Sequence, residues 1–193
     1  MPDNESNEMI DCWSVDKKMK LQIIRRMIAV CSLIVTNIFG DCKIDNNLML
    51  SILLNERHST KNPGYEYLIS FNNPAEAKSL KAHYKDFFLD ERTLDCKRLD
   101  SCVNFLNHLV KQGITNVDLG AYQLNYKYQK LNHEDYFRIE PSYFKACSYV
   151  EQMVDEIGYS WRGIAAYHSK TEKYNQIYRK NLISTYKAIV SRN

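Results

Sequence analysis

The chain has 193 residues, of which 45% are hydrophobic, so it can bury one substantial core and a single domain is the default expectation. Its formal net charge is only +3, and its 26 basic residues are interleaved with 23 acidic ones rather than gathered into a stripe. Binding to nucleic acid would need a concentrated basic surface. The composition therefore argues against nucleic acid as a partner.

The N-terminal part of the sequence has the pattern of an export signal. Residues 1–18 form a polar leader, and initiation at Met19 would leave it untranslated. From Met19, basic residues precede the apolar run 27–35, and a cleavage point follows Gly40. We expect residues 19–40 to be a signal peptide and the protein to be periplasmic. An uncleaved N-terminal anchor, which would be the protein's only membrane contact, and a buried amphipathic helix are the alternatives.

Cleavage after Gly40 would leave four cysteines, at Cys42, Cys96, Cys102 and Cys147. An even number in an exported chain favours disulfides, and four cysteines allow three pairings. Among these we favour the short loop from Cys96 to Cys102. The cysteines have neither Cys-x-x-Cys spacing nor histidines between them, so we expect no metal site.

A helix over residues 48–56 is predicted to end in a functional carboxyl group. Asp45 and the two asparagines after it can cap its first turn. Leu48, Ile52 and Glu56 follow at helical spacing, so one face runs apolar, apolar, carboxylate. A carboxyl group buried away from cations keeps its proton toward neutral pH, as a general acid must. Glu56 is therefore a candidate acid, and an exposed residue in a last helical turn is the ordinary alternative.

The middle of the chain is predicted to contain a strand, two helices and a polar turn. Alternation within residues 65–73 predicts a short strand, and residues 75–89 and 92–110 predict helices, the second stopped by Gly113. The expected core side of that second helix carries Leu99, Val103, Leu106 and Val110.

In residues 113–126, a turn is followed directly by several amide and phenol side chains. Gly120 allows positive φ or close backbone approach, and the segment continues into Gln123, Asn125 and Tyr126. Amides offer both donors and acceptors, which suit sugar hydroxyl and acetamido groups. We interpret the segment as the wall of a site for a polar, ring-shaped ligand. The alternative is an ordinary turn with a polar helix start.

Two further helices are predicted in the C-terminal half. The first is stopped by Gly158 and carries an apolar stripe of Ala146, Val150, Met153, Val154 and Ile157. The segment 161–168 follows, in which Trp161 and Tyr167 are candidate core aromatics and His168 reads as a surface histidine. In the second helix the expected apolar face is formed by Tyr174, Ile177, Tyr178, Ile183, Tyr186 and Val190.

Three segments, in this order, resemble the motifs of lytic transglycosylases with a lysozyme-like domain. They are Leu50-x-x-Leu53-x-x-Glu56 followed by Asn62-Pro-Gly64, then Gly120-x-x-Gln123-x-Asn125, then Ala166-Tyr167. The stretch 113–118 resembles the small transglycosylases of type IV secretion systems. The sequence departs from the family pattern at Arg57, where Ser is expected, and at His168, where Asn is expected.

The resemblance implies a mainly α, lysozyme-like α+β fold over residues 41–193, with a small β-hairpin or extended loop at the cleft. It implies that Glu56 is catalytic and that Tyr167 hydrogen-bonds or orients its carboxylate. The substrate-binding residues that it implies are Gln123, Asn125, Tyr126, Tyr167 and Tyr174, with Tyr178 as an alternative match to Tyr174.

The implied activity is cleavage of the β-1,4 bond between N-acetylmuramic acid and N-acetylglucosamine in peptidoglycan, with formation of a 1,6-anhydro sugar. No cofactor is implied. The expected partners are peptidoglycan glycan strands and components of a type IV secretion system. A hydrolytic muramidase, with Asp118 orienting water, is one alternative. An inactive peptidoglycan-binding scaffold protein is the other.

Overall fold

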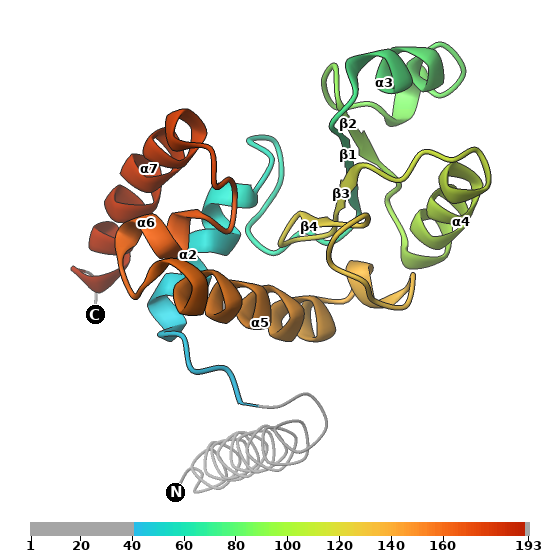
Figure 1. The fold of residues 1–193 in the computed structure, drawn as a ribbon. Coiled ribbons are helices and arrows are strands. Elements are labelled where there is room, and N and C mark those ends of the chain that lie inside the picture. The colour runs from blue at the N-terminus through green and yellow to red at the C-terminus, as the bar shows by residue number, and fades with distance from the viewer. Residues whose placement is uncertain (1–40, 192–193) are drawn as a thin grey trace, which may run out of the picture. The chain divides into compact units, whose positions relative to one another are not determined.

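The computed structural model describes residues 41–191. Residues 42–191 belong to one compact unit, shown in colour in Figure 1. The predicted polar leader and the predicted signal peptide over residues 19–40 lie outside the described residues. None of the described helices is long and apolar enough to cross a membrane.

Helices dominate the described part of the chain, which confirms the mainly α expectation. One group of helices packs together, with α2 and α6 against α7, and α5 against α6 (Figure 1). Two other helices, α3 and α4, lie beside the sheet and away from this helix group (Figure 1). The bounds are α2 Asn46–Glu56, α3 Pro74–Lys81, α4 Leu99–Lys111, α5 Ile139–Ile157, α6 Trp161–Ala165 and α7 Glu172–Val190, with 3-10 turns η1 Lys85–Phe87 and η2 Asp135–Phe137.

A four-stranded antiparallel sheet in the order β2-β1-β3-β4 completes the unit. Ile69 of β1 is the central residue, opposite Leu94 of β2 on one side and Leu119 of β3 on the other. The sheet is more than the small hairpin or loop expected from the sequence. Its strands are β1 Leu68–Phe71, β2 Thr93–Asp95, β3 Val117–Leu119 and β4 Leu124–Asn125.

Two predicted helices are shorter in the structure, and one open alternative is excluded. The helix expected over 92–110 begins only at Leu99, because Thr93–Asp95 pairs with β1 instead. The helix expected over 75–89 ends at Lys81, and η1 follows. Residues 113–126 do not start a helix, because β3 and β4 form a hairpin there.

The helix that carries Glu56 forms as the local sequence predicts. The Asp45 side chain caps its first turn by accepting hydrogen bonds from the backbone N–H groups of Asn47 and Leu48, at 3.0 and 3.1 Å. Leu48 and Ile52 are buried in the core, at 5% and 0% exposure. Because Glu56 lies on the same face one turn later, burial of that face carries the carboxylate inward.

The last helix turns a different face to the core from the one expected. Its buried residues are Asn175, Tyr178 and Leu182, whereas Tyr174 and Ile177 are 54% and 57% exposed. The Asn175 side chain donates hydrogen bonds to the backbone oxygens of Arg162 and Ser169, both at 3.0 Å. These bonds fix the rotation of α7 against the α6 region. The face is therefore set by a polar contact that hydrophobic periodicity does not reveal.

Two disulfides close the unit. The predicted Cys96–Cys102 bridge is present and joins the end of β2 to α4. Cys42–Cys147 joins the segment before α2 to α5 across a sequence separation of 105 residues. The second bridge therefore closes a loop that contains the whole sheet.

Candidate functional site

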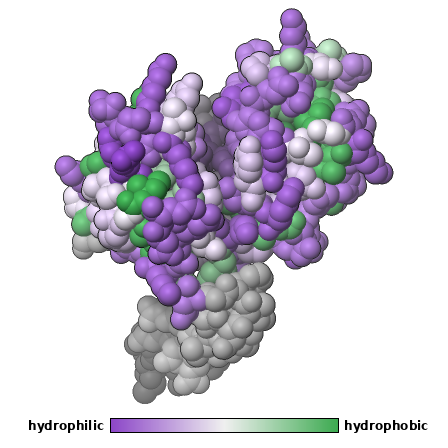
Figure 2. Space-filling model, viewed as in Figure 1, coloured by the Kyte–Doolittle hydropathy of each residue, from purple (hydrophilic) through white to green (hydrophobic). Residues whose placement is uncertain are grey.

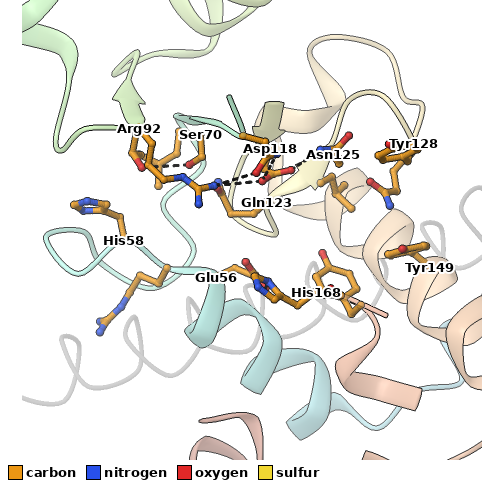
Figure 3. Close-up of a pocket in the computed structure, with 18 of the residues that line it drawn as sticks. Glu56, His58, Ser70, Arg92, Asp118, Gln123, Asn125, Tyr128, Tyr149 and His168 are labelled. Carbon is orange, nitrogen blue, oxygen red and sulfur yellow. Dashed lines mark hydrogen bonds and ion pairs between the residues drawn. The ribbon is translucent and has the colours of Figure 1, made fainter. Parts of the chain in front are cut away.

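A cavity of about 860 Å³ lies between the sheet on one side and, on the other, the end of α2 with Glu56 and the turn between α6 and α7 with His168. Figure 3 shows Glu56 and His168 on one side of it, with Ser70, Asp118 and Gln123 from the sheet and its hairpin on the other. Hydrophilic side chains cover most of the face shown in Figure 2, and polar side chains predominate in the lining as well. Its size is within the range of ligand pockets, and its polarity suits a hydroxyl-rich ligand.

Glu56 lies at the C-terminal end of α2, at the base of this cavity. Its side chain is only 11% exposed, and no described residue makes a hydrogen bond to its Oε1. His168 Nδ1 lies 3.8 Å from that oxygen. Arg57 also lines the cavity but is exposed, and no ion pair between Arg57 and Glu56 occurs in the part of the chain that the structure describes. The candidate acid is therefore inside the site and is not neutralised by its arginine neighbour.

His168 is a site residue that the sequence interpretation missed. Its ring stacks on the Tyr178 ring, with centroids 4.6 Å apart and an interplanar angle of 2°. Interaction with the Glu56 carboxylate raises the pKa of His168, against burial, which lowers it. Burial, together with the same carboxylate, raises the pKa of Tyr178 well above its usual value. Histidine in place of the family's asparagine was the available signal, but only the fold shows that it faces the acid.

Asp118 of β3 faces the same cavity from the sheet side. Asn125 Nδ2 donates to its Oδ1 at 2.7 Å, Asn72 Nδ2 donates to its Oδ2 at 2.9 Å, and Arg92 Nη2 lies 3.5 Å from Oδ2. Burial raises the pKa of Asp118, although the two amides and Arg92 lower it. Both carboxylate oxygens are thus held by protein groups, and Asp118 organises this wall.

Asn125 is less available to a ligand than the sequence suggests. Its Nδ2 donates to Asn116 Oδ1 at 3.0 Å as well as to Asp118, and its Oδ1 accepts from Lys127 N at 3.0 Å. The amide lines the cavity, but both of its hydrogens are used internally. Asn125 therefore positions the wall and has only an oxygen lone pair left for a ligand.

Gln123 is better placed as a ligand contact. It has a positive φ of 48°, and its Nε2 donates to Gly120 O at 2.8 Å, which leaves its second N–H and its Oε1 for a ligand. Gly120 has φ of 71°, and a Cβ there would lie 1.9 Å from the Tyr136 backbone oxygen. Glycine is thus required at the turn that presents Gln123.

The three predicted tyrosines lie in different environments. Tyr167 lines the cavity, but its hydroxyl donates to the Tyr122 backbone oxygen at 2.6 Å rather than to Glu56. Tyr126 does not line the cavity and instead packs on Tyr136 and His133. Exposed Tyr174 lies at the cavity lining. The structure therefore keeps Tyr167 and Tyr174 in the site and separates Tyr126 from it.

The sheet, the residues that flank its strands, and α5 add lining residues that no motif signalled. They include an exposed tyrosine, Tyr128, and a partly buried one, Tyr149, together with Ser70, Asn72, Arg92 and Gln129. Within the described range 41–191, no group of three or more His, Cys, Asp or Glu side chains is placed to hold a metal ion.

Comparisons of the chain with protein-family models, with curated proteins and with solved structures find no match.

Proposed function

We propose that the protein is a peptidoglycan lytic transglycosylase of lysozyme-like fold. The observation that carries the proposal is the position of Glu56, a nearly buried carboxyl group at the base of a large polar cavity. Gln123, from the second motif, and Tyr167, from the third, line the same cavity although the three residues are far apart in the sequence. Their convergence supports the resemblance, because unrelated chance matches would have no reason to meet.

The arrangement around the cavity supports the lysozyme-like assignment. A helix that ends in the acid lies on one side, and a small antiparallel sheet lies on the other. In the proposed complex, this division would bring the proton donor below the glycan and the amide groups along it. The exposed Tyr128 and Tyr174 rings at the lining provide apolar faces for sugar rings.

In the proposed reaction, protonated Glu56 donates its proton to the glycosidic oxygen as the bond to C1 of the muramic residue breaks. The Glu56 carboxylate then takes the proton from the C6 hydroxyl of that residue as its oxygen closes on C1. The nucleophile belongs to the substrate, so its effective concentration is high. Gln123 holds hydroxyl or acetamido groups. The net result is a 1,6-anhydro end with no water consumed.

A hydrolytic muramidase is the second candidate, because Asp118 faces Glu56 across the same cavity and its charge interacts with that of Glu56. An inverting hydrolase needs a second carboxylate that is free to activate water. Both oxygens of Asp118 already accept hydrogen bonds from Asn125 and Asn72. We therefore favour the intramolecular route over hydrolysis.

The two disulfides support the location of the protein in an oxidising compartment such as the periplasm. We propose that the enzyme opens peptidoglycan locally for an envelope-spanning secretion machine. The support for this partner is the resemblance of residues 113–118 to the small transglycosylases of type IV secretion systems.

The test is digestion of purified sacculi, with mass analysis of the released muropeptides. The wild-type protein should release anhydro-muropeptides, and Glu56→Gln should lower the rate by at least about 100-fold, because a positioned general acid contributes that much or more. Glu134→Gln is the matched control, since Glu134 is an exposed residue paired with Arg138 outside the cavity.

Three other results would change the assignment. Products with reducing ends, lost in Glu56→Gln, would establish the hydrolase. Sacculus binding without release by any variant would indicate a binding protein. Equal release by the wild-type protein and Glu56→Gln would remove Glu56 from the mechanism.

A further inference from the structure

One oxygen of the proposed catalytic acid lacks a hydrogen-bond donor and faces a titratable ring. Glu56 Oε1 is buried, and no hydrogen bond reaches it from the described residues. A buried carboxylate oxygen is costly to leave in this state. His168 Nδ1 lies 3.8 Å away, just beyond hydrogen-bond distance (Figure 3). A small movement would close this gap, as often happens when an open site binds its substrate.

The His168 ring is held so that it connects Glu56 with the solvent. Its backbone N–H donates to Ala165 O at 3.2 Å, and stacking on Tyr178 restricts the ring plane. The His168 side chain is 48% exposed, whereas that of Glu56 is 11% exposed. A proton from water can therefore reach the imidazole more easily than it can reach the carboxyl group.

Other charged groups near the pair do not replace this contact. Asp118 raises the pKa of His168 and Arg92 lowers it, but Glu56 has the larger influence. On the helical side, Tyr167 and Tyr178 have pKa values raised well above the usual value by burial, so both stay neutral.

Two further basic groups line the cavity. Arg57 is exposed and makes no ion pair with Glu56 in the described part of the chain. His58 is committed elsewhere, since its Nε2 lies 3.2 Å from Asp90 Oδ2. Tyr178 also interacts with Glu56 but keeps its proton, so among residues 41–191 it is His168 that is placed to exchange a proton with Glu56.

We propose that Glu56 and His168 hold one proton between them, which the imidazole carries while the cavity is open to water and Glu56 carries when a bound glycan excludes water. This inference rests on the proposed function, because Glu56 is the acid of that reaction. His168 acts through Glu56 and is a positioning residue rather than a catalytic one.

Water exclusion supplies the driving force for the transfer. In the open cavity, solvent stabilises the ion pair of carboxylate and imidazolium. A bound glycan removes that solvent, and a charged pair loses more solvation than a neutral pair of carboxylic acid and imidazole. In the transfer the bond from Nδ1 to hydrogen breaks and a bond from Oε1 to hydrogen forms. The charge of the pair does not change, and no further reactant is needed.

The consequence is that a proton is available to Glu56 at neutral pH. A carboxyl group alone would be mostly ionised there. In the pair, the acid stops working only when the pair loses its one shared proton, and the pKa of that loss belongs to both groups together. The basic limit of activity is therefore set by the imidazole as well as by the carboxyl group.

The first test is the pH profile of kcat/KM on sacculi for the full-length protein. In His168→Asn the basic limb should move to lower pH by up to about two units, because a carboxyl group ordinarily loses its proton about that far below an imidazole. His83→Asn is the matched control, because His83 is exposed and lies outside the cavity, and the basic limb of this variant should stay in place. A lower rate at all pH values with an unmoved limb in His168→Asn would show a merely structural role and overturn the proposal.

The second test needs no turnover and so separates this inference from the proposed function. The ring signal of His168 is assigned by its loss in His168→Asn and followed by NMR through a pH titration. Glu56→Gln should lower the pKa of His168, while His133, which pairs with Asn107, serves as the internal reference.

An unmoved His168 titration in Glu56→Gln would overturn the pairing even if the protein cleaves glycan. Conversely, a lowered pKa in a protein that cleaves no glycan would support the pair and refute the transglycosylase.

Discussion

Replacing Gly120 by Ala should destabilise the protein more than replacing Gly113, although the two glycines have similar positive φ values of 71° and 77°. Each substitution forces an L-residue into the left-handed region, which costs about 1–2 kcal/mol. At Gly113 no other atom lies within 4 Å of the added Cβ. At Gly120 the added Cβ would lie 1.9 Å from the Tyr136 backbone oxygen, so the backbone itself must move.

That movement adds about 1–3 kcal/mol of overpacking to the Gly120 variant, for a total of about 2–5 kcal/mol against about 1–2 kcal/mol for Gly113→Ala. Thermal unfolding should show a loss in Tm of about 2–4 °C for each kcal/mol in a unit of this size. Equal losses in the two variants would refute the reasoning, because it attributes the difference to the Tyr136 contact.

The same pair of variants tests the site. Gly120 O accepts the hydrogen bond from Gln123 Nε2 at 2.8 Å, so displacement of the turn moves the Gln123 amide. Below the Tm of both variants, Gly120→Ala should digest sacculi more slowly than Gly113→Ala. Equal rates would show that the position of Gln123 does not limit the reaction.

Three further outcomes are expected. Replacing Cys42 and Cys147 together by Ser should lower the free energy of unfolding by about 2–5 kcal/mol, because the bridge spans a sequence separation of 105 residues; an unchanged denaturation midpoint would contradict this. Because burial raises the pKa of Asp118, the folded state binds its proton more tightly than the unfolded chain does, and this contribution is lost as pH rises through the folded pKa. Asp118→Asn should therefore gain stability relative to the wild type as pH rises from acid to neutral. Denaturation at several pH values measures this trend, and a trend of the opposite sign would contradict the prediction. Tyr167→Phe should cost about 1–3 kcal/mol, since it leaves the buried Tyr122 oxygen without its donor, and a change near zero in urea unfolding would argue against that bond.

Sequence patterns identified the elements that depend on local interactions. The cap at Asp45 and the stripe through Leu48 and Ile52 predicted the helix, which the structure confirms. They left Glu56 either partly buried or exposed, and its side chain is 11% exposed. The stop at Gly158 and the short Cys96–Cys102 bridge were also predicted correctly. Capping, helical spacing and short loop closure all act between residues that are near in the chain, so the sequence alone was sufficient.

The other half of the site depends on pairing between distant segments. Strand pairing placed Thr93–Asp95 beside β1 where a helix was expected, and Asn72 and Asn125 came to hold Asp118. Tyr126 turned toward His133 and away from the cavity.

The contact between His168 and Glu56 joins residues from opposite ends of the described chain. No local pattern encodes it. The rotation of α7, which brings Tyr178 beneath the His168 ring, is fixed by Asn175. The sequence by itself determined which residue is the candidate acid, and the tertiary structure determined its proton partner, because that choice depends on how separate helices pack.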